Sequence, residues 1–107
     1  MFIYDVQDLL ECRRNLRVSL HALREAYKEG LRGRDIIYAI FKGRIIEHYP
    51  DRGRVLVLGP SAKSGLPLHV VCDYRNADED AIVAVTVYVP DRTHWAAHPA
   101  RRHKSAK

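Results

Sequence analysis

Two histidines, a threonine and a tyrosine are the residues of this 107-residue chain whose types could together carry out acid–base chemistry. His21 lies in a stretch of helical spacing. The other candidates lie in two stretches of alternating residues: His69, Thr86 and Tyr88. Cleavage of RNA without a metal needs a base for the ribose 2′-hydroxyl, a cation for the phosphorane oxygens and an acid for the leaving 5′-oxygen. Because histidine titrates near neutral pH, His21 and His69 could supply the base and the acid in either order.

Basic residues near these positions could hold the phosphate. Arg24 follows His21 by three residues and Lys28 follows Arg24 by four, so the three side chains are expected to share one helix face. Arg44 and Arg54 begin two expected strands and are further candidates for nucleic-acid binding. Each candidate also has an ordinary structural explanation, since a basic helix face is commonly just solvated and a strand histidine commonly pairs within the fold.

Other catalytic and metal-binding patterns are missing from the sequence. It contains no P-loop, nucleophile elbow, zinc-protease helix or paired-carboxylate motif. Cys12 and Cys72 are far apart and stand in no metal-ligand spacing, so we expect reduced thiols, with a disulfide as the minority alternative. We therefore expect neither a metal nor another cofactor.

The charge balance points to a polyanionic partner. The chain has 18 Lys and Arg residues against 13 Asp and Glu residues, a formal net charge of +5, and this excess favours nucleic acid through counterion release. Its length suits one domain, and 47% hydrophobic and 29% charged residues are ordinary globular values. We find no signal-peptide pattern and no run of about 18 apolar residues, so a cytoplasmic protein that does not contact a membrane is expected.

The N-terminal part is predicted to form two or three helices. Apolar residues recur at spacings of three and four over residues 5–17, which predicts a first helix. Ser19 is suited to cap a second helix, which would end at Gly30. Its apolar stripe consists of Leu20, Leu23, Ala26 and Tyr27. A third helix is expected to open at residues 33–35 and to end at Gly43.

After the helices the spacing becomes alternating, which predicts strands at about 44–49, 54–59, 67–74 and 81–89. Turn-forming residues separate them at 50–53, 60–65 and 76–80. Such short connections require antiparallel neighbours. The predicted fold class is therefore α+β, with two or three N-terminal helices packed on a four-stranded antiparallel sheet. Residues 1–95 would form the single domain, and residues 96–107 a flexible basic tail that is either frayed or in contact with phosphates.

Alternation also predicts which side chains share a face of the sheet. In the strand at 67–74 the core side would carry Leu68, Val70, Cys72 and Tyr74. In the strand at 81–89 it would carry Val83, Val85, Val87 and Val89. The opposite, open face would then carry His69, Thr86 and Tyr88.

Several stretches resemble the small bacterial domain-of-unknown-function family 4258, namely residues 19–23, 42–51, 55–59, 65–71 and 85–95. That family looks related to the barnase, EndoU, colicin and RelE-like superfold of ribonucleases and toxins. The resemblance implies a helix-then-sheet domain that binds and cleaves RNA, and its pattern falls on His21, His69, Thr86 and Tyr88. Members usually carry an arginine four residues after the helix histidine. Here that position is Glu25, whose carboxylate would favour the protonated imidazole of His21 and would repel phosphate.

We therefore expect a toxin-related, ribonuclease-like domain that binds RNA and cleaves it without a metal. The alternative is a non-catalytic domain that binds nucleic acid or a protein, such as an antitoxin-like partner or a second copy of the chain. Either a monomer or a homodimer fits the sequence.

Overall fold

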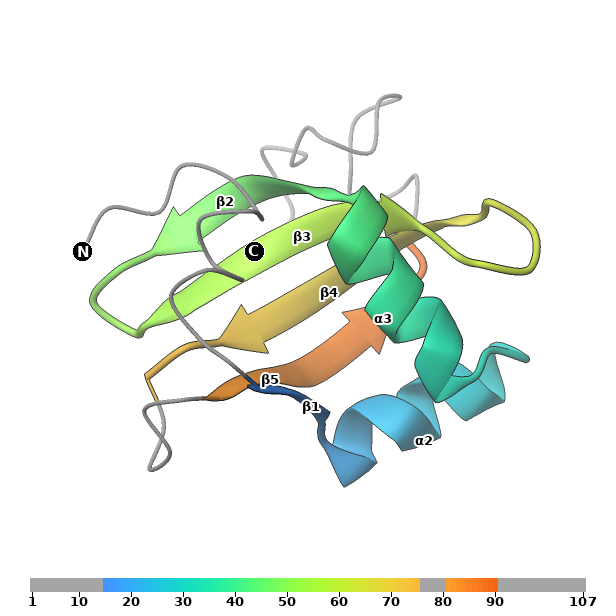
Figure 1. Ribbon diagram of the computed structural model, residues 1–107, viewed down its shortest axis with the longest axis horizontal. Helices are drawn as coiled ribbons and strands as arrows, with labels where there is room; N and C mark the ends of the chain where they lie inside the picture. Colours follow the sequence, from blue (N-terminus) through green and yellow to red (C-terminus); the bar gives the residue numbers. More distant parts are fainter. Residues whose placement is uncertain (1–14, 76–80, 91–107) are drawn as a thin grey trace.

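A computed structural model describes residues 15–75 and 81–90 of the chain, in which two helices lie across the same face of a five-stranded sheet (Figure 1). In chain order the elements are β1 (Asn15–Val18), α2 (Leu20–Lys28), α3 (Gly33–Lys42), β2 (Arg44–Tyr49), β3 (Arg54–Pro60), β4 (Pro67–Asp73) and β5 (Ala81–Tyr88). The strand order is β1-β5-β4-β3-β2. Only β1 and β5 are parallel, and the other neighbours are antiparallel.

The predicted four-stranded antiparallel sheet is therefore wrong. The sheet has a fifth strand, β1, which includes residues 15–17 at the end of the predicted first helix. Residues 5–14 of that predicted helix lie outside the described residues. Leu16 and Val18 pack against the core and alternate with two exposed residues. This alternation covers only four residues, so the longer helical spacing of residues 5–17 dominates the sequence-based prediction. A parallel pair needs a long connection. Here the connection consists of both helices and three strands.

The ends of α2 and α3 agree with the sequence. The hydroxyl of Ser19 accepts a hydrogen bond from the backbone N–H of Ala22 at 3.0 Å and so caps α2. Gly30, with φ of +75°, follows α2 in the left-handed conformation that glycine favours. α3 ends where Gly43 was predicted to end it. These boundaries depend on local capping, which is why the sequence predicts them.

The core lies between the helices and the sheet. Ala22 and Ala26 of α2 pack near β5, while Ile36, Ala39 and Ile40 of α3 pack on β3 and β4. The sheet contributes Val55, Val57, Leu68, Val70, Cys72, Ala84 and Val87. Burial on this scale removes apolar surface from water and supplies most of the stabilisation.

The predicted core side of the last strand is wrong in part. Val71 of β4 pairs with Thr86, but the next residue, Cys72, pairs with Ala84, so Val85 forms a bulge. The bulge shifts the alternation by one residue, and the core side therefore carries Ile82 and Ala84 in place of Val83 and Val85. A bulge depends on the register with β4, which local alternation does not contain.

The turns predicted at 50–53 and 60–65 are present, with Gly53 and Gly65 at φ of +66° and +71°. The turn predicted at 76–80 and the tail at 96–107 lie outside the described residues. The division at residue 95 therefore stays a prediction. Among the residues that the structure describes, no helix is long and apolar enough to cross a membrane.

Candidate functional site

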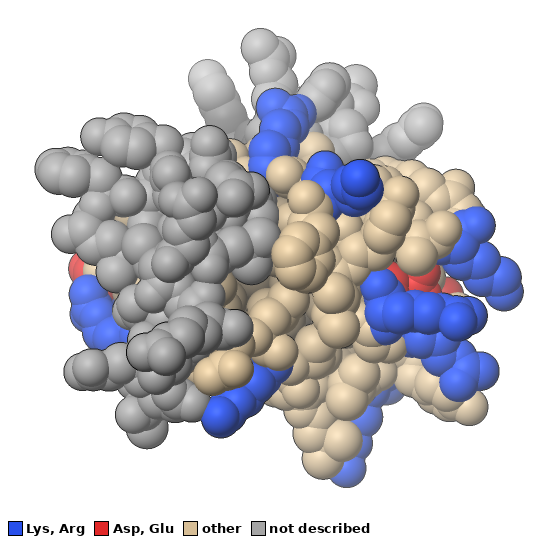
Figure 2. All heavy atoms as spheres, in the orientation of Figure 1, with Lys and Arg blue, Asp and Glu red and all other residues tan. Residues whose placement is uncertain are grey.

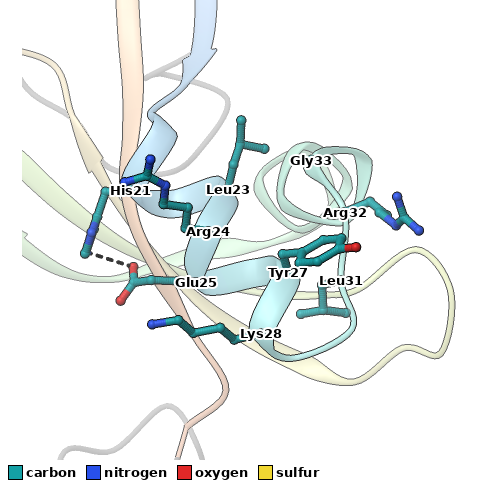
Figure 3. Close-up of a pocket in the computed structure, with 9 residues that line it drawn as sticks. All are labelled: His21, Leu23, Arg24, Glu25, Tyr27, Lys28, Leu31, Arg32 and Gly33. Atoms are coloured by element: carbon teal, nitrogen blue, oxygen red, sulfur yellow. Dashed lines mark ion pairs between the residues drawn. The ribbon is translucent and has the colours of Figure 1, made fainter.

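His21 lies on the surface of α2, with 68% of its side chain exposed. Its Nε2 atom is 3.3 Å from Oε1 of Glu25, one helical turn further along (Figure 3). A carboxylate that contacts one ring nitrogen orients the imidazole and leaves the other nitrogen for a second partner. His21 is therefore a positioned histidine that is open to solvent.

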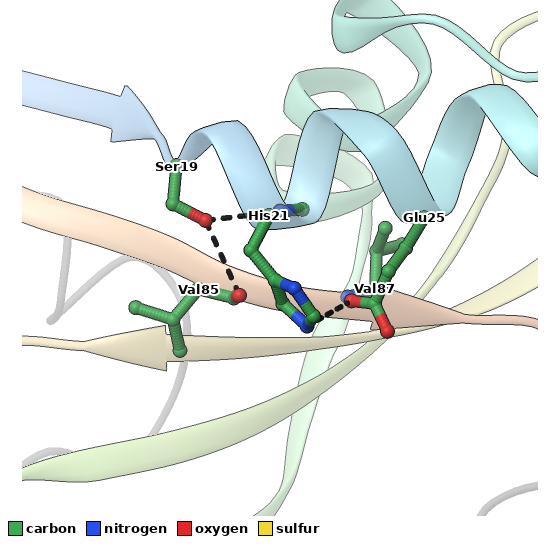
Figure 4. Close-up of polar contacts among 6 residues, drawn as sticks. Ser19, His21, Glu25, Val85 and Val87 are labelled. Carbon is green, nitrogen blue, oxygen red and sulfur yellow. Dashed lines mark hydrogen bonds and ion pairs between the residues drawn. The ribbon is translucent and has the colours of Figure 1, made fainter.

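Glu25 is in turn anchored to the sheet. The backbone N–H of Val87 in β5 donates a hydrogen bond to Oε1 of Glu25 at 3.1 Å (Figure 4). Ser19, the residue before α2, also bonds to β5. Its backbone N–H donates to the carbonyl of Ala84 at 2.9 Å, and its hydroxyl donates to the carbonyl of Val85 at 3.2 Å. The beginning of α2 thus lies along β5, beyond the point where β1 ends. The side chains of Ser19 and Glu25 form hydrogen bonds with backbone groups of β5.

The contact with Val87 gives Glu25 a structural role at the position where the family resemblance leads us to expect an arginine. From the sequence, Glu25 is expected to act through its charge, on His21 one turn earlier and on phosphate, whereas in the structure it contacts His21 directly and also joins α2 to β5. The spacing of four residues indicates the contact with His21. No local signal indicates the contact with Val87, because Glu25 and Val87 are 62 residues apart in the chain.

A groove of about 710 Å³ runs over α2 and the beginning of α3 (Figure 3). Its polar lining includes His21, Arg24, Glu25 and Lys28. The predicted sharing of one helix face by His21, Arg24 and Lys28 is thus observed, and the cations lie within one or two turns of the histidine. This arrangement can offer positive charge and a proton-transfer group to one phosphate.

His69 and Tyr88 form a second, separate pair. They occupy paired positions on β4 and β5, and Nδ1 of His69 lies 3.3 Å from the Tyr88 hydroxyl oxygen. The rings meet edge to face at a centroid distance of 5.2 Å. Both side chains, with that of Thr86, are on the sheet face opposite the helices, as alternation predicts, but His69 is completely buried.

The four predicted catalytic residues are therefore not gathered around one described groove. His21 lines the groove over α2, and His69, Thr86 and Tyr88 are not among its lining residues. His21 contacts Glu25, and His69 contacts Tyr88. A common catalytic role for all four stays a prediction.

The two strand arginines lie away from His21. Arg54, at the start of β3, forms an ion pair with Asp73 at 3.4 Å. Arg44 is exposed at the start of β2, the strand at the far edge of the sheet from α2. Since β2 and β5 are three strand spacings apart, Arg44 lies roughly 14 Å across the sheet from the edge that α2 covers. A single phosphate at His21 would contact neither arginine.

Cys72 is a free thiol in the core, and its complete burial raises the thiol pKa to about 12. Cys12 lies outside the described residues. In the ranges 15–75 and 81–90, no three His, Cys, Asp or Glu side chains are grouped so that they could hold a metal ion.

The fold and the groove define a small α+β domain with a mixed sheet, whose first described helix carries a positioned histidine beside two cations. The chain belongs to the family described as Domain of unknown function (DUF4258), which matches residues 18–89. The match runs from the last residue of β1 to just beyond β5, and it confirms the resemblance seen in the sequence. No curated protein and no solved structure matches the chain.

Proposed function

We propose that this domain binds RNA on the polar face of α2 and that His21 transfers a proton in metal-independent cleavage of the RNA backbone. The observation that supports this most directly is the exposed His21 ring, which Glu25 holds from one side. Glu25 is itself fixed by the backbone of β5. Catalytic histidines need such a combination of access and orientation.

The charges around His21 suit a phosphate. Arg24 and Lys28 line the same groove, and an arginine fork binds phosphate oxygens in a bidentate manner. The negative charge of Glu25 opposes phosphate, but its Oε1 already interacts with the N–H of Val87 and with His21. Three cationic residues, Arg24, Lys28 and Arg32, therefore line the groove together with one carboxylate that is already engaged.

The proposal gives His69 and Tyr88 a supporting role. Because His69 is buried and both rings lie on the sheet face opposite the helices, a substrate bound at the α2 groove contacts neither ring. The relation to the barnase, EndoU, colicin and RelE-like ribonucleases, and a cytoplasmic location, are parts of this same proposal. The sequence resemblance supports the relation to these ribonucleases, and the positive net charge supports an RNA partner.

Cleavage is tested with a fluorescently labelled single-stranded RNA in the presence of EDTA. We expect turnover by the wild-type chain, and a loss of about 100-fold or more in His21→Ala, the range for removal of an acid–base group. Glu25→Gln should reduce turnover less, because the amide keeps a polar contact to the histidine. RNA that the wild-type chain binds but leaves intact would refute the catalytic part and favour the non-catalytic alternative.

Binding is tested separately by fluorescence anisotropy over a range of salt concentrations. The double variant Arg24→Ala/Lys28→Ala should lower the salt slope by about 1.4, since each phosphate contact on a single strand contributes about 0.7. The matched control Arg52→Ala/Lys63→Ala removes the same charge from the exposed residues of two turns. Equal losses in the two double variants would show that only net charge matters and would refute a site on α2.

A further inference from the structure

The outer surface of the two helices carries large apolar side chains that the core does not use. Their exposed fractions range from 38% to 69%. We call them the helix-pair patch, which consists of Leu20, Leu23, Tyr27, Ile37, Tyr38 and Phe41. An apolar stripe on an amphipathic helix ordinarily faces the core. On α2, however, the core side is formed by Ala22 and Ala26 instead.

The patch is continuous from one helix to the other. Leu23 lies close to the beginning of α3, since its Cδ2 atom is 3.2 Å from the position that a Cβ on Gly33 would take. Ile37 and Phe41 follow Gly33 at intervals of four residues and so continue along the same side of α3. Figure 2 shows uncharged side chains across the middle of this helix-covered side, with Lys and Arg around them.

The margin of the patch is positive. The helices and their connection contribute Arg24, Lys28, Arg32, Arg34 and Lys42. Two of the three acidic residues in this part of the chain, Glu25 and Asp35, already accept hydrogen bonds from backbone N–H groups. An apolar surface with a cationic margin suits a partner with apolar anchors and acidic flanks.

We propose that the helix-pair patch binds an acidic amphipathic helical segment of another protein, whose apolar face covers the patch and whose Asp and Glu residues lie against the basic margin. Leu20 and Tyr27 are seven residues apart, which is about 10 Å along α2, so two to three turns of a bound helix would cover the stripe. The helix-pair patch adjoins the His21 groove, because Leu23 and Tyr27 line that groove as well. Binding of the peptide segment does not depend on RNA cleavage.

Other occupants fit the patch less well. A second copy of this chain would bring two basic margins together, and each copy carries a net charge of +5. RNA bases stack on aromatic rings, whereas Leu20, Leu23 and Ile37 offer aliphatic surface. Apolar side chains of a protein segment would cover all of these residues.

The test is a displayed library of helical peptides of about 14 residues, long enough to span the patch. Leucines are fixed at helical spacing, and Glu, Lys, Gln or Ala varies at the other positions. Selection on the full-length protein should enrich Glu over Lys. The chosen peptides should bind the double variant Tyr27→Ala/Phe41→Ala at least about tenfold more weakly than the wild type, because exposed aromatics act as anchors.

Leu66→Ala is the matched control, since Leu66 is 39% exposed, much as Leu23 is, but lies in the loop between β3 and β4. It should bind the peptides as the wild type does. Failure to enrich Glu, or equal binding to the Tyr27→Ala/Phe41→Ala variant, would overturn the proposal. A wild-type dimer that this variant converts to a monomer would also overturn it, because the occupant would then be a second copy.

Discussion

Replacement of Gly59 by alanine should separate α3 from the sheet. A Cβ at position 59 would lie 1.9 Å from the carbonyl oxygen of Ala39, 2.6 Å from its carbonyl carbon and 2.9 Å from its Cα. All three are backbone atoms of a packed helix, so no side-chain rotation relieves the contact. To restore an ordinary separation of about 3.4 Å, the helix must move by roughly 1.5 Å and loosen its packing on β3.

We expect Gly59→Ala to lower the free energy of unfolding by about 3 kcal/mol, the upper end of the usual cost of overpacking. For a domain of this size that is a fall in Tm of roughly 12–24 °C. Gly59 does not have a positive φ, so the substitution would otherwise be neutral or slightly stabilising. The contact with Ala39 therefore decides the sign. Urea unfolding followed by circular dichroism measures it.

Gly33→Ala is the control for this experiment, because its new Cβ would meet only the flexible end of Leu23, at 3.2 Å. Its free energy of unfolding should stay within about 0.5 kcal/mol of the wild type. If Gly59→Ala unfolds at the same urea concentration as the wild type, the close packing of α3 on β3 is refuted.

The remaining predictions concern two buried groups. Burial by itself raises the pKa of Asp35, but backbone N–H groups of Arg32, Lys63 and Ala62, with the charge of Arg34, outweigh it and hold the pKa below its ordinary value. The ionised Asp35 thus stabilises the fold above about pH 4, and this stabilisation is lost as the pH falls further. Asp35→Asn should therefore lower the free energy of unfolding by about 1–2 kcal/mol at pH 7 and by less at about pH 3. Urea unfolding at both pH values measures this, and an unchanged difference would contradict it. Burial raises the pKa of the Cys72 thiol to about 12. A thiol reagent should therefore react slowly with Cys72 in the folded Cys12→Ser variant and rapidly with the same variant unfolded in urea. Fast labelling of the folded protein would contradict the burial.

The parts of this fold that depend on neighbouring residues were predictable from the sequence. Ser19 caps α2, Gly30 and Gly43 follow the two helices, and alternation with turn residues marks β2 to β5. The placement of Arg24 and Lys28 beside His21 also follows from helical spacing alone. In each case the relevant groups lie within a few residues of one another in the chain.

Contacts between distant segments decided the rest. β1 becomes a strand because Leu16 and Val18 pack against a core that the chain completes only at β5, and the bulge at Val85 depends on pairing with β4. The contact of Glu25 with Val87 fixes which side of α2 faces the sheet. It thereby holds His21 on the surface and leaves Leu20, Leu23 and Tyr27 of α2 exposed. Residue types and local spacing thus determined which groups could do chemistry, whereas the rotation of α2 against β5, which needs both segments folded together, decided which of them share a surface.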